Sequence, residues 1–385
     1  GSSYEYKQTA DIDMSGCTWE TAIGSNSTNF EGTYDGDGFA ITNLTVSKAS
    51  ANYLGLFGDI GGLSTVKNLS ITNATVSGGS YIGILAGSVN SGATIENIST
   101  SGSVTGSGGW VGGLIGESSG RVSSSSSTAQ VAGVNLFVGG LIGITQGGTI
   151  QSTFATGDVS TGTPVSGLGG LIGEVGAGTT LVTDSYATGN VTTSGSGSYA
   201  GGLVGILRAG AITQSFASGD VDSGSSVDAT GGLVGQAQAN VSNSYATGSV
   251  SGSLNVGGLI GTAASMTLED SYSTGAVSGV GAQVGGLLGK QSVTTASNSF
   301  WDTDTSNTED SALEGAGVTG KETTEMKTLS TFSDATWDIG DGWQSGETWG
   351  ICDGTTYPFL IWQYDESPCS LTTPTVDTAE STSSG

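Results

Sequence analysis

The side chains in this sequence that could do chemistry are carboxylates. There are 34 Asp and Glu residues against 8 Lys and Arg, and there is no histidine. The absence of histidine excludes Ser-His-Asp and Cys-His nucleophile schemes and every histidine-ligated zinc site. Paired carboxylates remain, and these are the groups with which polysaccharide lyases and glycosidases work.

The carboxylates do not recur together at one position of the repeated pattern described below. The position before its last Val is occupied by Asp158, Asn190, Asp220, Ser249 and Ala276. A second position has Asp184 and Asp270, where other copies have Ser152, Gln214 and Asn243. Acids that occur singly are typical of a solvated surface. We therefore predict no catalytic residue, no cofactor and no enzyme activity.

The run at 302–313 resembles a calcium-binding loop. Asp302, Asp304 and Ser306 stand at its positions 1, 3 and 5. However, position 6 is Asn307 rather than Gly and position 12 is Leu313 rather than Glu. We predict a turn-rich loop and no metal site.

The charge balance excludes several kinds of partner. The net charge is 8 − 34 = −26, and Arg208 is the single basic residue between Arg121 and Lys290. Binding to nucleic acid or to an anionic membrane surface needs clustered Lys and Arg, so we predict neither. No apolar run of about 18 residues is present, so we also predict no membrane insertion.

The chain is built from internal repeats of 26 to 32 residues. The string VGGLIG at 111–116 recurs with small changes, and its leucines are Leu56, Leu85, Leu114, Leu141, Leu171, Leu203, Leu233, Leu259 and Leu287. Between them lies a second pattern, for example VTDSYATGNV at 182–191. No helical apolar spacing occurs, and the Gly-Gly pairs would break a helix.

Such short repeats cannot bury their own apolar face and must stack on their neighbours. Propeller blades are longer and less variable in length, so a solenoid is favoured. We predict an all-β fold, a parallel β-helix of about ten coils stacked about 4.8 Å apart. The predicted organisation is an N-terminal cap with first coils (1–50), solenoid repeats (51–300), an aromatic-rich C-terminal cap (301–367) and a Ser/Thr-rich tail (368–385).

Stacking turns each repeat position into a column. We expect an internal aromatic column at Phe154, Tyr186, Phe216, Tyr245, Tyr272 and Phe300. A hydroxyl column consists of Thr128, Thr156, Thr188, Ser218, Thr247 and Thr274. Facing outward, that column would match ice or a glycan; alternatively, these residues are ordinary turn neighbours of glycine.

Cys352 and Cys369 flank one aromatic-rich segment. They are candidates for a disulfide, which would fit an oxidising extracellular compartment. The alternative is that all three cysteines are buried or idle thiols, and the odd number, with Cys17 far away in sequence, counts against an oxidising compartment.

The repeated (V/A)GGL(I/V)G followed by SYATG resembles the GLUG-motif repeats of bacterial surface proteins. These include filamentous-haemagglutinin-like adhesins and the non-catalytic regions of some immunoglobulin A peptidases. NSFWDTDTS at 298–306 and TTYPFLIWQ at 355–363 resemble the usual closing segment. The resemblance implies a right-handed parallel β-helix in a secreted or surface-anchored protein without activity of its own. The cysteine pair departs from the family pattern.

Three functions follow as hypotheses. The first is a non-enzymatic extracellular β-solenoid that serves as a stalk or adhesion module of a bacterial surface or secreted protein, with a host or matrix glycan or protein as partner. The second is a subunit that self-associates into an extracellular filament through open solenoid ends. The third, a polysaccharide-active β-helix enzyme, would need several carboxylates converging on one face.

Overall fold

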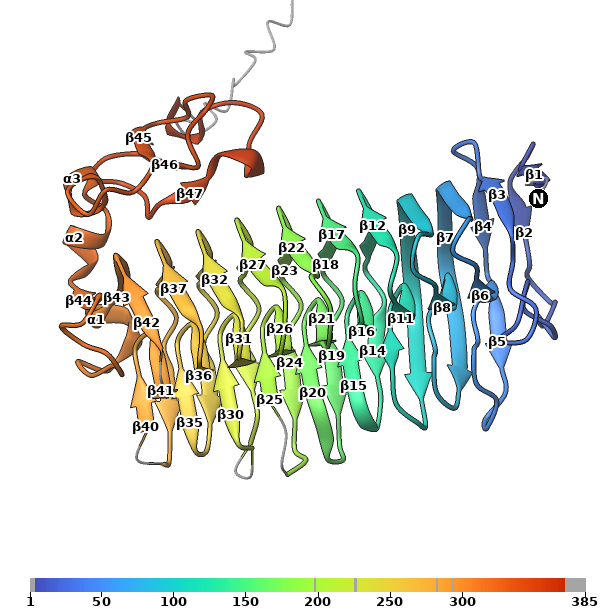
Figure 1. Ribbon diagram of the computed structural model, residues 1–385, viewed down its shortest axis with the longest axis horizontal. Helices are drawn as coiled ribbons and strands as arrows, with labels where there is room; N and C mark the ends of the chain where they lie inside the picture. The colour runs from blue at the N-terminus through green and yellow to red at the C-terminus, as the bar shows by residue number, and fades with distance from the viewer. Residues whose placement is uncertain (1–3, 197–198, 225–226, 282, 293, 371–385) are drawn as a thin grey trace, which may run out of the picture. The chain divides into compact units, whose positions relative to one another are not determined.

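The computed structural model describes residues 4–196, 199–224, 227–281, 283–292 and 294–370. The chain forms two compact units, Gly1–Glu322 (the solenoid unit) and Thr323–Gly385 (the C-terminal unit). The solenoid unit is a β-solenoid of about ten turns whose strands pair in parallel from coil to coil (Figure 1). The predicted fold class is thereby confirmed.

One coil contains five short strands. In the coil that contains the anchor Leu171 these are β20 (Val165–Gly169), β21 (Ile172–Val175), β22 (Leu181–Thr183), β23 (Tyr186–Ala187) and β24 (Val191–Thr193). The Gly-Gly-Leu string connects the first two, and the second sequence pattern forms the last three. Each strand pairs with its counterparts in the coils before and after, so equal repeat positions lie side by side.

The other coils repeat this order. The first position holds β10 (Val111–Gly112), β15 (Asn135–Gly139), β25 (Tyr199–Gly201), β30 (Ala229–Gly231), β35 (Asn255–Gly257) and β40 (Gln283–Gly285). The second holds β6 (Phe57–Ile60), β8 (Ala86–Val89), β11 (Ile115–Ser118), β16 (Ile142–Thr145), β26 (Val204–Leu207), β31 (Val234–Ala237), β36 (Ile260–Ala264) and β41 (Leu288–Ser292). The last three hold β12 (Arg121–Ser123), β13 (Ser126–Ser127), β14 (Gln130–Ala132), β17 (Thr149–Gln151), β18 (Phe154–Ala155), β19 (Val159–Thr161), β27 (Ala211–Thr213), β28 (Phe216–Ala217), β29 (Val221–Asp222), β32 (Asn240–Ser242), β33 (Tyr245–Ala246), β34 (Val250–Gly252), β37 (Thr267–Glu269), β38 (Tyr272–Ser273), β39 (Val277–Gly279), β42 (Thr295–Ser297) and β43 (Ser299–Asp302). The N-terminal coils consist of β1 (Tyr4–Lys7), β2 (Ile12–Asp13), β3 (Gly32–Asp35), β4 (Ala40–Thr42), β5 (Thr45–Ser47), β7 (Thr65–Gly78) and β9 (Thr94–Gly106).

The leucine anchors of the repeat are buried, as the spacing predicts. Each of the nine is at most 3% exposed. Together with the following Ile or Val they form the apolar interior of the solenoid. Burial of these aliphatic columns is the main favourable contribution to folding.

The second glycine of most pairs faces the alanine of the second pattern across this interior, and Gly113 and Gly258 face Ser127 and Ser273 there. A Cβ added to Gly202 would lie 2.1 Å from the carbonyl oxygen of Gly232 and 3.0 Å from the Cβ of Ala217. Gly170 stands in the same relation to Gly202 and Ala187, at 2.0 and 3.0 Å. Because no other side chain fits there, each Gly-Gly pair is a packing requirement.

Trp301 ends this arrangement. It pairs in register with Ser273, in the column that Ala occupies in earlier coils, and it is fully buried. A Cβ on Gly286 would overlap its indole ring. The indole therefore fills space over the last Gly-Gly pair, and β44 (Val318–Lys321) completes the unit by pairing with β43.

A buried hydroxyl ladder follows the corner between the third and fourth strands of each coil. Its members are Ser125, Thr153, Ser185, Ser215, Ser244, Ser271 and Ser299, all fully or almost fully buried. The Oγ of Ser215 donates to the carbonyl oxygen of Thr213 at 2.8 Å and accepts the backbone N–H of Ser185 at 3.3 Å. The corner residue Gln214 has φ 47°. We did not predict this ladder, although the pattern contains its hydroxyl residue in every copy.

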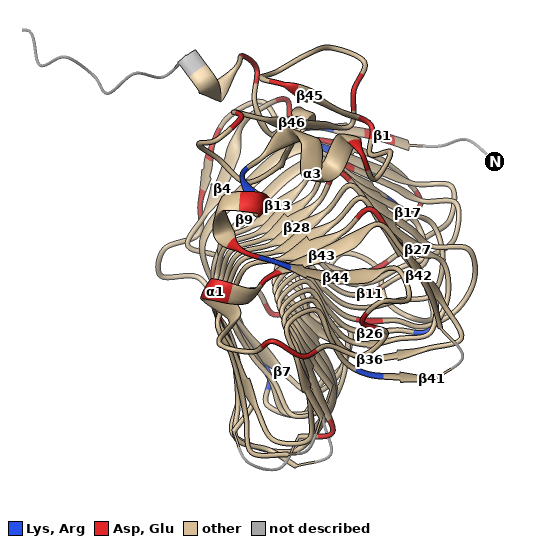
Figure 2. Ribbon diagram, turned by 90° about the vertical axis from the view of Figure 1, so that its left-hand side faces the viewer, with Lys and Arg blue, Asp and Glu red and all other residues tan. Residues whose placement is uncertain are grey.

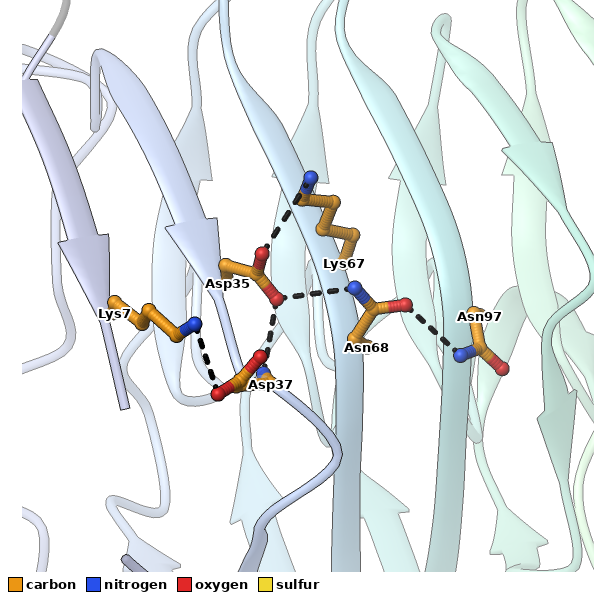
Figure 3. A network of polar contacts seen from close by, with 6 residues as sticks. All are labelled: Lys7, Asp35, Asp37, Lys67, Asn68 and Asn97. Atoms are coloured by element: carbon orange, nitrogen blue, oxygen red, sulfur yellow. Dashed lines mark hydrogen bonds and ion pairs between the residues drawn. The ribbon is translucent and has the colours of Figure 1, made fainter. Parts of the chain in front are cut away.

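In the N-terminal coils, asparagines stabilise the corresponding corner. Asn68 and Asn97 both have φ 54°. The Asn97 amide donates to Asn68 at 3.0 Å, and the Asn68 amide donates to Asp35 at 3.0 Å (Figure 3). Asp35 also accepts the N–H of Asp37, which forms an ion pair with Lys7 at 2.9 Å. The Asp-Gly turn at residues 35–38 is thus tied to the first strands of the solenoid.

The C-terminal unit has its own aromatic core. It contains α2 (Thr323–Met326), α3 (Leu329–Ser333), β45 (Ile339–Asp341), β46 (Trp349–Ile351), β47 (Phe359–Leu360) and short 3₁₀ turns at Ile361–Gln363 and Pro368–Ser370. Phe332, Trp337 and Trp349 contact one another with ring centroids 4.8 and 4.9 Å apart. The segment predicted as a C-terminal cap, 301–367, is divided between the two units. Most of the predicted tail, from 371 onward, lies outside the described residues.

Helices are few and short in the described part of the chain, and none of them is long and apolar enough to cross a membrane.

Replacing Gly202 by Ala is expected to destabilise the solenoid by about 1–3 kcal/mol or more, because the new Cβ would overlap the next coil. Gly162→Ala is the matched control, since a Cβ there meets nothing within 4 Å and its φ is ordinary. Urea unfolding followed by circular dichroism measures both. Equal stability of the two variants would contradict the packing role of the Gly-Gly pair.

Replacing Ser215 by Ala is expected to cost about 1–3 kcal/mol, because the buried N–H of Ser185 loses its acceptor. Ser218→Ala, which removes an exposed hydroxyl three residues along the same coil, should leave stability unchanged. Thermal unfolding of the two variants tests this. A loss shared by both would show that the buried ladder has no special role.

Candidate functional site

The second sequence pattern presents a regular outward face. Along β18 and its continuation, Ala155 and Gly157 are buried, whereas Phe154, Thr156 and Asp158 point the other way and are half-buried or exposed. The same alternation recurs in the neighbouring coils. We call the resulting set of aromatic, hydroxyl and acid columns the outward face.

The predicted hydroxyl column lies on the outward face. Thr128, Thr156, Thr188, Ser218 and Thr247 are exposed, and Thr274 is half-buried. Aromatic residues flank the column on one side, and Asp, Asn or Ser residues flank it on the other. The hydroxyl row is therefore one residue wide.

The prediction of an internal aromatic column is wrong for Phe154, Tyr186 and Phe216, which are half-buried and point outward. Tyr245, Tyr272 and Phe300 are buried, as predicted, although they lie outside the aliphatic core. The physical reason is that the Gly-Gly backbone occupies the space inside, which leaves room for Ala or Ser in the coils before Trp301. Successive rings lie 4.9–5.0 Å apart with interplanar angles of 3–8°, so neighbouring rings cover each other's faces.

The acid column has a structural role. Asp158 Oδ1 accepts a hydrogen bond from the backbone N–H of Asn190 at 2.9 Å. In the same way, the side chain of Asn190 accepts the backbone N–H of Asp220 at 3.0 Å, and the side chain of Asp220 accepts the backbone N–H of Ser249 at 2.8 Å. These side chains link one coil to the next. Asp184 and Asp270, at the other position, are corner residues with φ 50° and 45°.

A groove of about 470 Å³ runs across β9, β14, β19 and β24 on the outward face. Its polar lining includes Gln130, Asp158, Ser160, Asn190 and Thr192. Seen along the stack, Asp and Glu are scattered over turns and edges of the coils (Figure 2). The groove thus offers amide, hydroxyl and carboxylate groups and no cation.

The remaining predicted sites have structural explanations. Cys352 and Cys369 form a disulfide with Cα atoms 5.4 Å apart, while Cys17 is free and exposed. Asp302 is buried and caps α1 (Thr303–Ser306) by accepting two backbone N–H groups of that helix. Within the described residues, no group of three or more Cys, Asp or Glu is arranged to hold a metal.

Three buried or half-buried acids lie elsewhere, in one column of the second strand position, and sequence spacing did not reveal them. Burial raises the pKa of Asp59 to about 6. A hydrogen bond of 2.7 Å, which the Asn90 amide donates to Asp59 Oδ1, acts in the opposite direction and lowers this pKa. Burial also raises the pKa of the Glu117 carboxyl, and the negative charge of Asp59 raises it further. Glu174 likewise has a raised pKa through burial, although Arg208 contacts it at 3.0 Å. The GGL(I/V)G strings do not show this column, because the residue after the last Gly varies from coil to coil.

Residues 228–251 match the family described as the GLUG motif. This stretch covers β30 to β34, which is one coil of the solenoid. This coil carries the GLUG motif. The equivalents of its strands pair throughout the stack, so the other coils share its architecture. The predicted likeness to filamentous-haemagglutinin-like adhesins stays a prediction.

Two relatives resemble the GLUG coils. Halomucin of Haloquadratum walsbyi is 36% identical over 96 residues, which cover 22% of this chain and 1% of halomucin. A putative Gly-rich membrane protein of Evansella cellulosilytica is 40% identical over 404 residues, which cover 93% of this chain and 42% of that protein. The chain thus spans less than half the length of either relative. A GLUG-repeat β-solenoid fits a structural surface protein.

Replacing Asp59 by Asn is expected to stabilise the chain at about pH 7.5 by up to about 3 kcal/mol. The pKa of Asp59 rises from 3.8 to about 6 on folding, so the folded state holds more protons between these values. Wild-type stability therefore falls as pH rises through that window, and the advantage of the variant should vanish by about pH 4. Urea unfolding across this range measures it; a pH-independent difference would contradict the assignment.

Proposed function

We propose that this chain is a non-enzymatic extracellular module, a GLUG-repeat rod that serves as a stalk or adhesion element of a surface or secreted protein. The observation that carries the proposal is that the repeated side chains form columns along the stack. Acids that repeat on the outward face bind the backbone of the next coil, as Asp158 and Asp220 do, instead of converging on one point.

The relatives support the surface location. One is named a membrane protein and the other a mucin, and a passive outer layer would fit both names. The disulfide between Cys352 and Cys369 suits an oxidising compartment. The low density of charge, with 11% Asp, Glu, Lys and Arg, suits a partner recognised by hydroxyl and aromatic groups.

A panel of neutral and acidic polysaccharides tests the non-enzymatic part. We expect no new reducing ends and no unsaturated products after long incubation with the chain. Turnover of any member that is abolished by Asp158→Asn or Glu117→Gln would overturn the proposal in favour of a β-helix enzyme. Binding to immobilised matrix glycans or proteins, measured with the whole chain, then separates adhesion from a purely mechanical stalk.

A second candidate function, assembly into a filament, is favoured by the ends of the solenoid unit. Among the described strands, β1 pairs with β3 alone, and its Tyr4 and Tyr6 are 66% and 50% exposed. An exposed edge strand offers unpaired backbone groups to another chain. Electron microscopy at rising concentration decides this alternative: fibres or end-to-end pairs support it, and single rods at every concentration exclude it.

A further inference from the structure

A second aromatic stack lies away from the outward face, at the start of the first strand position. Tyr53, Tyr81 and Trp110 stack with ring centroids 4.3 and 4.5 Å apart and interplanar angles of 7° and 18°. Each is followed by a residue that forms a parallel β-bridge or strand pair with its counterpart in the next coil; Leu54, for example, pairs with Ile82. The sequence pattern did not predict this stack, because these residues lie outside the SYATG pattern.

All three residues have a left-handed backbone, with φ values of 58°, 60° and 61° for Tyr53, Tyr81 and Trp110. This region is unfavourable for bulky side chains and persists where the surroundings enforce it, often at functional sites. Here it directs three rings in succession into one stack.

The stack begins at Tyr53, and a pocket of about 630 Å³ lies there. Its other wall comes from the preceding coil, residues 20–27, which includes Ile23 in register with Phe57. Among the described ring contacts, Tyr53 stacks on Tyr81 alone. The pocket therefore occupies the place that one more ring of the stack would fill, and it has the volume of a small-ligand site.

Polar groups surround this aromatic wall. Lys48 donates to the backbone carbonyl of Glu20, and its Nζ lies 3.6 Å from the Glu20 carboxylate. Asn52 lines the pocket, and it is held in place because its Oδ1 accepts the N–H of Ser80 at 2.8 Å. The charged pair makes the pocket close to neutral, and carboxylate, ammonium and amide groups can each bind hydroxyls.

We propose that this pocket binds a neutral hexopyranose unit of a surface or matrix glycan. An aromatic face accommodates the apolar face of a pyranose ring, while the surrounding polar groups bind its hydroxyls. The net charge of −26 repels acidic polysaccharides and so favours a neutral sugar. The inference rests on the adhesion form of the proposed function and gives it a site and a ligand class.

An array of neutral and acidic oligosaccharides, followed by titration calorimetry on the whole chain, tests the site. We expect binding of at least one neutral hexose oligosaccharide, weakened about tenfold or more by Tyr53→Leu because the aromatic wall is lost. Trp110→Leu is the matched control, since it removes a ring from the other end of the stack and should change affinity less than twofold. Glu20→Gln alters an exposed side chain without threatening the fold and should weaken binding severalfold.

Three results would overturn the site. One is the absence of binding to every neutral glycan, and another is an equal loss in Tyr53→Leu and Trp110→Leu. The third is a preference for acidic glycans that survives in high salt. Binding that persists in Tyr53→Leu would leave adhesion intact and locate it elsewhere, whereas turnover of a polysaccharide would refute the proposed function independently of this pocket.

Discussion

The solenoid depends on the close approach of two backbones across a narrow interior. Up to Gly258, the second glycine of each Gly-Gly pair faces a carbonyl oxygen of the next coil and an alanine or serine of the opposite strand, with no space for a Cβ. This contact sets the spacing between the Gly-Gly-Leu strands and the strands of the outward face. Residues on either side of it then have little choice of direction: leucines point inward, and rings point outward.

Because the coils stack in register, a contact that stabilises one corner is repeated in many coils. The left-handed corner at Gln214 would be costly in an isolated turn, but here a buried serine satisfies the neighbouring backbone groups in each coil. Asparagines do the same at the N-terminal corners. Trp301 shows how the series stops, because an indole in the alanine column leaves no space for another Gly-Gly coil.

The same regularity limits what the surface can do. A column repeats one functional group at coil spacing, which suits binding to a repeating polymer or to a matrix, whereas catalysis needs different groups brought together at one point. The irregular places are therefore informative. The Tyr53 pocket lies between residues 20–27 and the coil that contains Tyr53, where the sequence departs from the repeated pattern, and it combines an aromatic wall with polar groups.

The repeat spacing was sufficient to predict the parallel solenoid, its number of coils and the buried leucines, because these follow from periodicity and from the need to bury apolar side chains. The sequence also showed which residues share a column, such as Thr156 with Thr188. It did not show which way a column faces. Phe154 looks like a core residue by type, and only the Gly-Ala contact inside the coil excludes it from the interior. The acid column that includes Asp59 and Glu117 and the stack at Tyr53 depend likewise on packing between coils, which the sequence of one repeat does not contain. Composition and period thus determined the architecture, and the tertiary structure alone decided the direction and burial of each side chain, since those depend on what the neighbouring coil leaves room for.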